Sequence, residues 1–263
     1  MKSRKELEIT LLEKLSRKKL YFNSIEECLL NGVRKDQFIN DLLQCDGKEL
    51  FGTKPKFFSI SSSSALAINS FAFWKDNLNY LVFSDQTNFF KISFEKKFEN
   101  GLYSRIKPNI DIVLENSHSI FAIESKFLEF LKSPKVEFSE QYVRIADARK
   151  FTVWYDTMIK LKNGTIKYKY FDAAQIIKHY FGLSFSADVR SKKLVYLFWL
   201  PIDRSHYSEY IVEIEHFANE LKNATDVTFH YLEYSTLWDY WAEKVNNDFV
   251  ALYLENLKNR YLI

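Results

Sequence analysis

The sequence predicts an α/β fold with a mixed central β-sheet flanked by helices. An apolar hairpin pattern occupies the middle of the chain, at residues 108–129. A continuous apolar run at residues 194–200 fits a strand at the centre of a sheet that is covered on both faces. Segments with helical periodicity precede and follow these strands. Alternation of strands with amphipathic helices is typical of a sheet between helical layers.

The length and composition indicate a folded chain with a sizeable core. The chain has 263 residues, of which 47% are hydrophobic and 27% charged, as in ordinary globular proteins. Its 6 glycines and 4 prolines are too few for a disordered chain. We expect residues 1–50 to form an N-terminal helical extension packed on a main domain at residues 51–263.

Cysteine use and hydropathy predict a cytoplasmic protein. Cys28 and Cys45 are the only cysteines and lack the spacing of metal ligands, which favours a reducing compartment. The first 15 residues are charged throughout and lack the apolar centre of a signal peptide. No apolar run has the length needed to cross a bilayer, so we expect no membrane segment.

The distribution of charge is uneven along the chain. Residues 131–193 contain thirteen Lys or Arg and six Asp or Glu, whereas residues 194–263 contain five and eleven. A basic middle beside an acidic C-terminal third indicates a face for a polyanion. The alternative is a set of solvated faces without a ligand, and charge alone does not decide between them.

The first fifty residues have the pattern of short helices. Leucines recur at helical spacing in residues 6–20. Ser24 and Glu27 form a capping-box pattern, Gly32 ends that turn, and residues 33–43 resume a helix. Two short helices about a glycine turn are typical of a DNA-reading helix-turn-helix, but also of plain helix packing, and both interpretations stay open.

A helix and a half-buried strand precede the hairpin. Residues 61–74 begin with a serine run suited to an N-cap and carry an apolar stripe at helical spacing. Residues 91–98 alternate strictly between apolar and polar side chains, which predicts a strand with Glu95 on its polar face.

The segment after the hairpin mixes helical and turn signals. Residues 137–159 have a partly helical pattern. Asn163 and Gly164 form a favourable hairpin turn, which predicts paired strands at residues 158–162 and 165–170. Asp172 then caps a helix that we expect to end at Gly182. The closing elements are a helix at 207–222, a strand at 227–232 and one long helix at 236–262.

The central hairpin brings charged residues together in an apolar setting. Residues 110–114 and 120–127 are rich in β-branched and aromatic residues, as strands are. Because strand side chains alternate, Glu124 and Lys126 share one face. If Ser117 and His118 form the turn, the facing pairs are Asn116–Ser119, Leu114–Phe121 and Asp111–Glu124.

This charged trio, Asp111, Glu124 and Lys126, requires an explanation because buried charges are costly unless paired. Two carboxylates can hold a hard, oxygen-preferring cation such as Mg²⁺, with Mn²⁺ as an alternative. Such an ion polarises a phosphate and lowers the pKa of a bound water, which Lys126 would orient or deprotonate. The alternative explanation is a cross-strand ion pair with Lys126.

The same residues resemble the PD-(D/E)XK, or restriction-endonuclease-like, nucleases. Residues 108–111 (Pro-Asn-Ile-Asp) correspond to the first half of the family motif, with Asn109 in place of an acidic residue. Residues 123–126 (Ile-Glu-Ser-Lys) correspond to the second half. Residues 62–71 and 172–179 look like the equivalent stretches of a bacterial restriction-endonuclease-like subgroup. The resemblance spans roughly residues 61–200 and leaves out the N-terminal helices.

The resemblance implies roles for individual residues. Asp111, Glu124 and the carbonyl of Ser125 would bind the metal, and Lys126 would be the catalytic lysine. Glu95 falls where some members have an extra acidic residue, although a solvated strand carboxylate explains it equally well. In the exonuclease-type branch, a helical Gln is followed four residues later by Tyr. Gln175 matches the first position, whereas His179 takes the place of the tyrosine.

These observations predict a Mg²⁺-dependent DNA endonuclease of restriction-endonuclease-like fold, of the type II restriction class. Its partners would be double-stranded DNA and a second copy of the chain in a homodimer. The residues expected to contact DNA phosphates are Lys178, His179, Arg149 and Lys150. The alternatives are a catalytically silent nucleic-acid-binding module of the same fold, a non-specific or repair nuclease, and a structural protein in which the trio is an ion pair.

Overall fold

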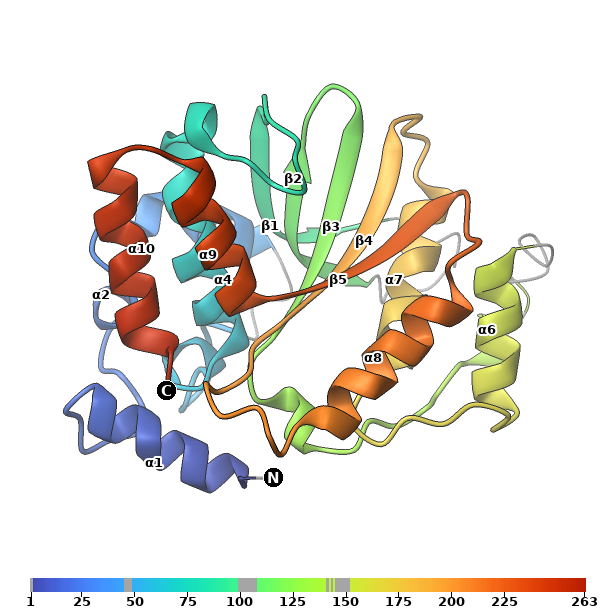
Figure 1. Ribbon diagram of the computed structural model, residues 1–263, viewed down its shortest axis with the longest axis horizontal. Helices are drawn as coiled ribbons and strands as arrows, with labels where there is room; N and C mark the ends of the chain where they lie inside the picture. Colours follow the sequence, from blue (N-terminus) through green and yellow to red (C-terminus); the bar gives the residue numbers. More distant parts are fainter. Residues whose placement is uncertain (1, 45–48, 99–107, 141, 143, 145–151) are drawn as a thin grey trace.

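A five-stranded mixed sheet forms the centre of the computed structural model (Figure 1), which describes all residues except 1, 45–48, 99–107, 141, 143 and 145–151. The strand order is β1-β2-β3-β4-β5. The first three strands are antiparallel, and β4 and β5 run parallel to β3. This arrangement confirms the predicted fold class. The strands are β1 (Lys91–Lys97), β2 (Asn109–Glu115), β3 (Ser119–Lys126), β4 (Ser191–Phe198) and β5 (Val227–Glu233).

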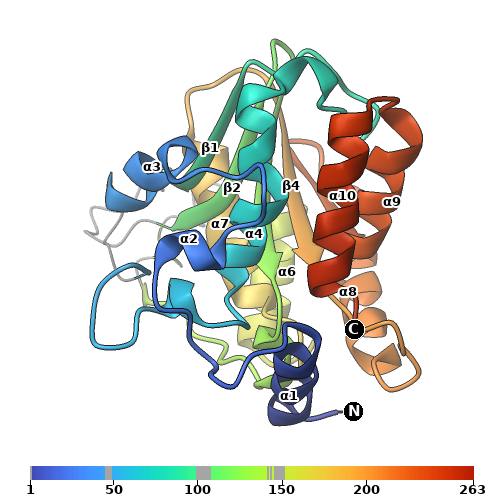
Figure 2. The same cartoon turned by 90° about the vertical axis from the view of Figure 1, so that its left-hand side faces the viewer.

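Helices cover both faces of the sheet (Figures 1 and 2). One core, the α4-side core, joins Phe121 and Ile123 of β3 to α4 (Ser63–Phe71), α9 (Tyr234–Lys244) and α10 (Asp248–Tyr261). The other, the α7-side core, joins Ile120 and Ala122 to the remaining large helices. Alternate residues of one strand therefore enter opposite cores. The helices of the α7-side core are α6 (Val153–Lys162), α7 (Ala173–Phe185) and α8 (Ser208–Glu220).

The N-terminal part packs against the α4-side core. Leu7 and Leu11 are buried there, and the Lys14 ammonium donates to the carbonyl of Leu262 at 2.7 Å. Figure 2 accordingly shows the first helix near the C-terminal end of the chain. The helices of this part are α1 (Arg4–Lys14), α2 (Ile25–Cys28) and α3 (Ile39–Gln44). Short 3-10 turns occur at Lys35–Gln37, Lys56–Phe58, Ala72–Asp76, Leu78–Tyr80 and Glu129–Leu131. The division at residue 50 stays a prediction.

The predicted hairpin register is confirmed for two of its three pairs, whereas the ladder ends at Ile112–Ile123, before Asp111 and Glu124. Leu114 pairs with Phe121, and the Asn116 amide donates to the carbonyl of Ser119 at 3.1 Å. The Asn116 side chain also accepts from the amides of His118 and Ser119, which fixes the turn. Both strands are largely buried on both faces, so the polar turn and not burial sets this register.

The predicted hairpin at Asn163 and Gly164 is wrong, because residues 153–162 form helix α6. Trp154, Met158 and Leu161 are buried at helical spacing, which favours a helix over a strand. Gly164 adopts a left-handed φ of 72°, and its amide donates to the carbonyl of Leu161. The Asn-Gly pair thus caps a helix instead of turning a hairpin.

Two predicted helix boundaries also differ from the structure. Gly182 lies inside α7, where an added Cβ would come 3.1 Å from the Cβ of Phe98. The glycine is needed there for close packing and does not end the helix. The expected single helix at 236–262 is two helices, since Val245 is extended and Asn247 caps α10 through its side chain.

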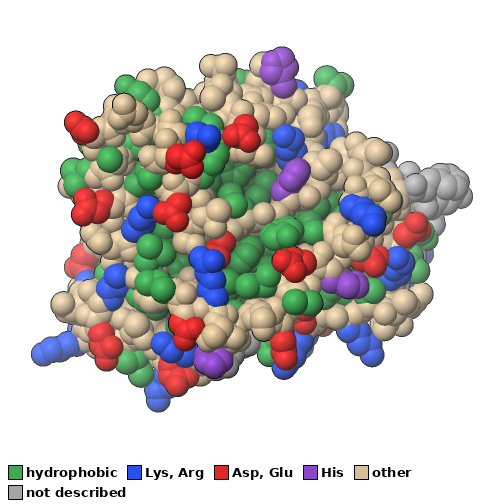
Figure 3. Space-filling view, viewed as in Figure 1, with side chains coloured by type: hydrophobic (Ala, Val, Ile, Leu, Met, Phe, Trp, Pro, Cys, Tyr) green, Lys and Arg blue, Asp and Glu red, His purple; other side chains and the backbone are tan. Residues whose placement is uncertain are grey.

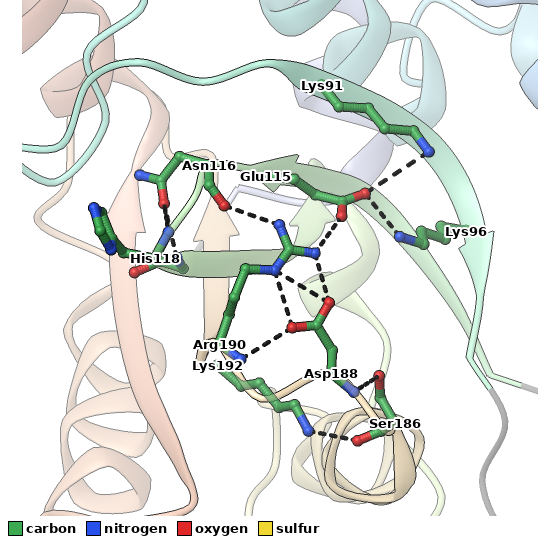
Figure 4. A network of polar contacts seen from close by, with 10 residues as sticks. Lys91, Lys96, Glu115, Asn116, His118, Ser186, Asp188, Arg190 and Lys192 are labelled. Atoms are coloured by element: carbon green, nitrogen blue, oxygen red, sulfur yellow. Dashed lines mark hydrogen bonds and ion pairs between the residues drawn. The ribbon is translucent and has the colours of Figure 1, made fainter.

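An arginine ties the start of β4 to the end of the β2 strand (Figure 4). Arg190 donates to the carbonyl of Asn116 at 2.9 Å, to Glu115 at 2.8 Å and to Asp188 at 2.6 Å. Its hydrogen bonds to Asp188 lower the pKa of that carboxyl to about 2. Burial raises the pKa of Glu115, but the hydrogen bonds from Lys96 and Arg190 outweigh burial and lower it overall.

We predict that Arg190→Ala destabilises the fold by about 1–3 kcal/mol at pH 7, because the buried Glu115 loses a charged donor. A carboxylate with a lowered pKa stabilises the fold above its unfolded pKa and loses this effect as the pH falls through its folded pKa. The difference from the unaltered chain should therefore shrink between about pH 4 and pH 2. Urea unfolding at several pH values measures it, and a difference that does not change with pH would contradict the electrostatic origin.

Candidate active site

The charged trio lies where β2 and β3 separate. The β2–β3 ladder runs to the pair Ile112–Ile123, whereas β3 continues beside β4 as far as Lys126. Past the end of the ladder, the Asp111 carboxylate accepts from the amide of Ser125 at 2.7 Å. A side chain thereby replaces the missing backbone contact and fixes Asp111 beside the Glu-Ser-Lys segment.

Next to this point, the side chains of the β1–β2 pair change the face of the sheet to which they point. The ladder pairs Phe94 with Ile112 and Lys96 with Ile110 but does not include Glu95. Ile112 belongs to the α4-side core and Ile110 to the α7-side core, so the strand exchanges faces between them. Glu95 has a φ of 49°, a left-handed conformation uncommon for glutamate. Such strained positions cluster at functional sites.

Side chains of helix α7 contact the Glu-Ser-Lys segment of β3. The Lys126 ammonium donates to Glu124 Oε1 at 2.5 Å and to Gln175 Oε1 at 2.8 Å. The other oxygen of Glu124, Oε2, lies 2.9 Å from His179 Nε2, although the ring is not aligned for a hydrogen bond. Gln175 and His179 are one helical turn apart, and the Asp172 carboxylate that caps α7 accepts from the Gln175 amide. Two side chains of one helix therefore contact both charged groups of β3.

Glu124 and Lys126 are both charged near neutral pH. Glu124 is only 2% exposed, and burial by itself raises its pKa. Lys126 and His179 outweigh that effect and hold the pKa of Glu124 at about 2. Burial lowers the pKa of Lys126, but Glu124, Glu129 and Asp111 together raise it above its ordinary value. Lys126 is therefore an ammonium, which is suited to orient a water and to offset negative charge. This favours an orienting role over the expected alternative, in which Lys126 deprotonates the water.

Burial and mutual repulsion raise the pKa of two carboxyls at this place, Asp111 and Glu95. Burial, and next Glu124 and Glu95, raise the pKa of Asp111 well above its ordinary value. Burial, and next Glu49 and Glu124, raise the pKa of Glu95 to about 7. Repulsion among buried carboxylates is relieved when a cation lies between them.

The donor atoms of the site fit a hard divalent cation. Asp111 and Glu124 supply carboxylate oxygens, and Glu124 Oε2 is buried without an aligned donor. In the part of the chain that the structure describes, no three His, Cys, Asp or Glu side chains gather into a ready-made metal site. A cation would therefore depend on these two carboxylates and on a backbone oxygen, for which Ser125 is the predicted donor.

The other predicted residues have different surroundings. Ser125 is buried, and its hydroxyl lies 2.7 Å from that of Tyr234. Lys178 lies on α7 with its ammonium 5.8 Å from the Phe138 ring. His179 is 3% exposed and faces Glu124, so we revise its role from a phosphate contact to a neighbour of that carboxylate. Arg149 and Lys150 lie outside the described residues.

Two contacts of the site were not predicted from the sequence. Tyr234 reaches Ser125 from the start of α9, 109 residues away in the chain. The Glu129 carboxylate accepts from the amide of Phe127 at 2.7 Å, which holds the chain just after Lys126. The spacing of Gln175 and His179 predicted that they share a helix face, whereas no local pattern indicates the contact with Tyr234.

A cavity of about 180 Å³ opens beside Lys126, with Tyr170, Asp172 and Lys132 in its wall. A neighbouring cavity of about 410 Å³ shares Glu129 and Lys132 with it. The second cavity extends to the N-terminal part, where it is lined by Arg4, Lys56, Ser61, Ser62 and Ser63. Cationic and hydroxyl side chains therefore lie along a path that leads to Lys126, together with the carboxylates of Glu49, Glu129 and Asp172.

A separate apolar groove of about 220 Å³ lies on the opposite face of the sheet. Phe121 and Val195, which belong to the α4-side core, line it together with Tyr231 and Tyr240. Figure 3 shows apolar side chains in this hollow at the middle of the visible face. It is not part of the site around Lys126, which contacts α7 on the other face.

Comparison with known families identifies the chain. A family model described as restriction endonuclease associating with ARP (REase-ARP) matches residues 4–262. The chain belongs to the REase-ARP family. Membership confirms the predicted restriction-endonuclease-like relationship and supports a nuclease-like function for the chain. No curated protein and no solved structure matches the chain.

The REase-ARP match includes the N-terminal helices that the motif resemblance left out. Those helices also line the larger of the two cavities near Lys126, through Arg4. None of the described helices combines the length and the apolar character that a membrane span requires.

Proposed function

We propose that the chain is a Mg²⁺-dependent DNA endonuclease, a type II restriction enzyme or a close relative. The observation that carries this proposal is the arrangement around Lys126. An ammonium is fixed between Glu124 and Gln175, and a second carboxyl of the site, Asp111, has a pKa that burial and the neighbouring carboxylates raise. A cation site beside a positioned ammonium is what phosphodiester hydrolysis requires.

In this proposal each residue has a defined task. Asp111, Glu124 and the Ser125 carbonyl would hold Mg²⁺, or Mn²⁺, which when bound polarises the phosphate and lowers the pKa of water. Lys126 orients the attacking water and offsets the charge that develops as phosphorus becomes pentacovalent. Gln175 keeps the ammonium in place by accepting one of its hydrogen bonds.

Double-stranded DNA would approach along the two cavities next to Lys126. Lys132, Lys56 and Arg4 lie along this path and would contact phosphates, and Lys178 of α7 is a further candidate. Phosphate contacts position DNA without reading its sequence. Since symmetric DNA sites are commonly cut by symmetric dimers, we propose a homodimer.

Digestion of unmethylated phage DNA by the purified chain tests this function. With Mg²⁺ we expect discrete fragments, and with EDTA we expect none. A Mg²⁺-dependent smear would retain the nuclease but replace the type II assignment with a non-specific or repair enzyme. Absence of cleavage by folded protein, together with binding of the same DNA, would favour the catalytically silent module.

A further inference from the structure

His179 has no evident role in the stability of the fold. The side chain is 3% exposed, and within the described residues its Nδ1 atom has no hydrogen-bond partner. Its one polar neighbour there is Glu124, 2.9 Å from Nε2. A buried polar group without a partner costs free energy, so an apolar side chain would serve the packing of α7 better. The contact with Glu124, and not the packing of α7, therefore explains why an imidazole is at this position.

The Glu124 carboxylate is contacted from both sides. Lys126 binds Oε1, and His179 lies against Oε2. Contacts to both oxygens restrict rotation of the carboxylate group about its terminal bond. His179 comes from the middle of α7, a 13-residue helix packed in the α7-side core, so its ring is held on a rigid element.

The hydrogen-bonding capacity of the ring is consistent with this arrangement. A neutral imidazole carries one N–H and one bare nitrogen. With the hydrogen on Nε2, the N–H nitrogen lies 2.9 Å from Glu124 Oε2, and a rotation of the ring would align it as a donor.

We propose that His179 is a positioning residue that keeps the Glu124 carboxylate turned so that it and Asp111 offer oxygens to the same cation. This inference rests on the proposed function, because it assigns a supporting role in that metal site. Groups that orient metal ligands typically change metal affinity or activity by about 10- to 100-fold when they are replaced.

The test compares His179→Leu, which has no donor, with His179→Gln, which keeps one. The first readout is the Mn²⁺ concentration that gives half of the maximal rise in Tm without DNA, and the second is kcat and KM for DNA cleavage. We expect His179→Leu to need about 10- to 100-fold more Mn²⁺ and to lower kcat with KM unchanged. His179→Gln should recover most of both effects. His216→Leu, at an exposed histidine of α8, is the matched control.

A folded His179→Leu variant with unaltered Mn²⁺ response and kcat would overturn the inference. If His179→Leu does not fold, His179→Gln and His179→Ala decide the question, since equal Mn²⁺ responses in these two would also overturn it. Failure of the proposed function would give a different result from failure of this inference. In that case the unaltered chain binds Mn²⁺ in a His179-dependent manner but does not cleave DNA.

Discussion

Asp111→Asn is expected to abolish DNA cleavage while increasing the stability of the folded chain at pH 7. Loss of a metal ligand removes several kcal/mol of transition-state stabilisation, which corresponds to roughly a 10³-fold lower rate. The asparagine oxygen can still accept from the Ser125 amide, so the fold keeps that hydrogen bond. The substitution removes a buried charge that Glu124 and Glu95 repel.

The gain in stability should depend on pH. Because the pKa of Asp111 is raised in the folded chain, the ionised group opposes folding from its ordinary pKa of 3.8 upward. Asparagine has no such effect, so the variant should be more stable at pH 7 and no more stable below about pH 4. Urea unfolding at both pH values measures the difference.

The response to Mg²⁺ distinguishes a metal site at the trio from a structural ion pair. Mg²⁺ should raise the Tm of the unaltered chain and leave that of Asp111→Asn unchanged, since a ligand stabilises only the state that binds it. Loss of stability in Asp111→Asn, together with no effect of Mg²⁺ on the unaltered chain, would show that the trio is a structural ion pair.

Lys126→Ala is expected to lower the cleavage rate by about 10²- to 10³-fold, the usual effect of removing one charge-stabilising donor. It should also lower stability by about 3–5 kcal/mol, because Glu124 would lose its charged partner while buried. Cleavage kinetics and urea unfolding of the same preparation give both numbers.

The double variant Lys126→Ala/Glu124→Gln tests the origin of the lost stability, and its cleavage stays low because Glu124 is also a proposed metal ligand. Removing the buried charge as well should recover stability without recovering cleavage. Lys258→Ala removes a lysine of α10 that pairs with Asp239 of α9, and it is the control for loss of a lysine elsewhere. A double variant that is as unstable as Lys126→Ala would contradict the unpaired charge of Glu124 as the origin of the lost stability.

The parts of the site that the sequence predicted are those that depend on local periodicity. The hairpin register follows from the polar turn, which Asn116 fixes, because the strands themselves are buried on both faces. Alternation placed Glu124 and Lys126 on one face, and helical spacing placed Gln175 and His179 together. The structure brings these two pairs into contact.

The parts that were missed depend on contacts between distant segments. Asn163 and Gly164 form a favourable hairpin turn in isolation, but burial of Trp154 and Met158 favours a helix for the segment before them. Gly182 continues α7 because Phe98 packs against it. The contact of Tyr234 with Ser125 joins segments that no sequence pattern relates. Local propensity is a weak guide wherever tertiary packing favours another structure.

Calorimetric titration of Mg²⁺ into the purified chain tests the central claim, that Asp111 and Glu124 form a metal site. The account predicts saturable binding by the unaltered chain and its loss in both Asp111→Asn and Glu124→Gln. Asp156→Asn, which changes a carboxylate on α6, should bind as the unaltered chain does. Equal binding by all four proteins, or none by the folded unaltered chain, would contradict the claim.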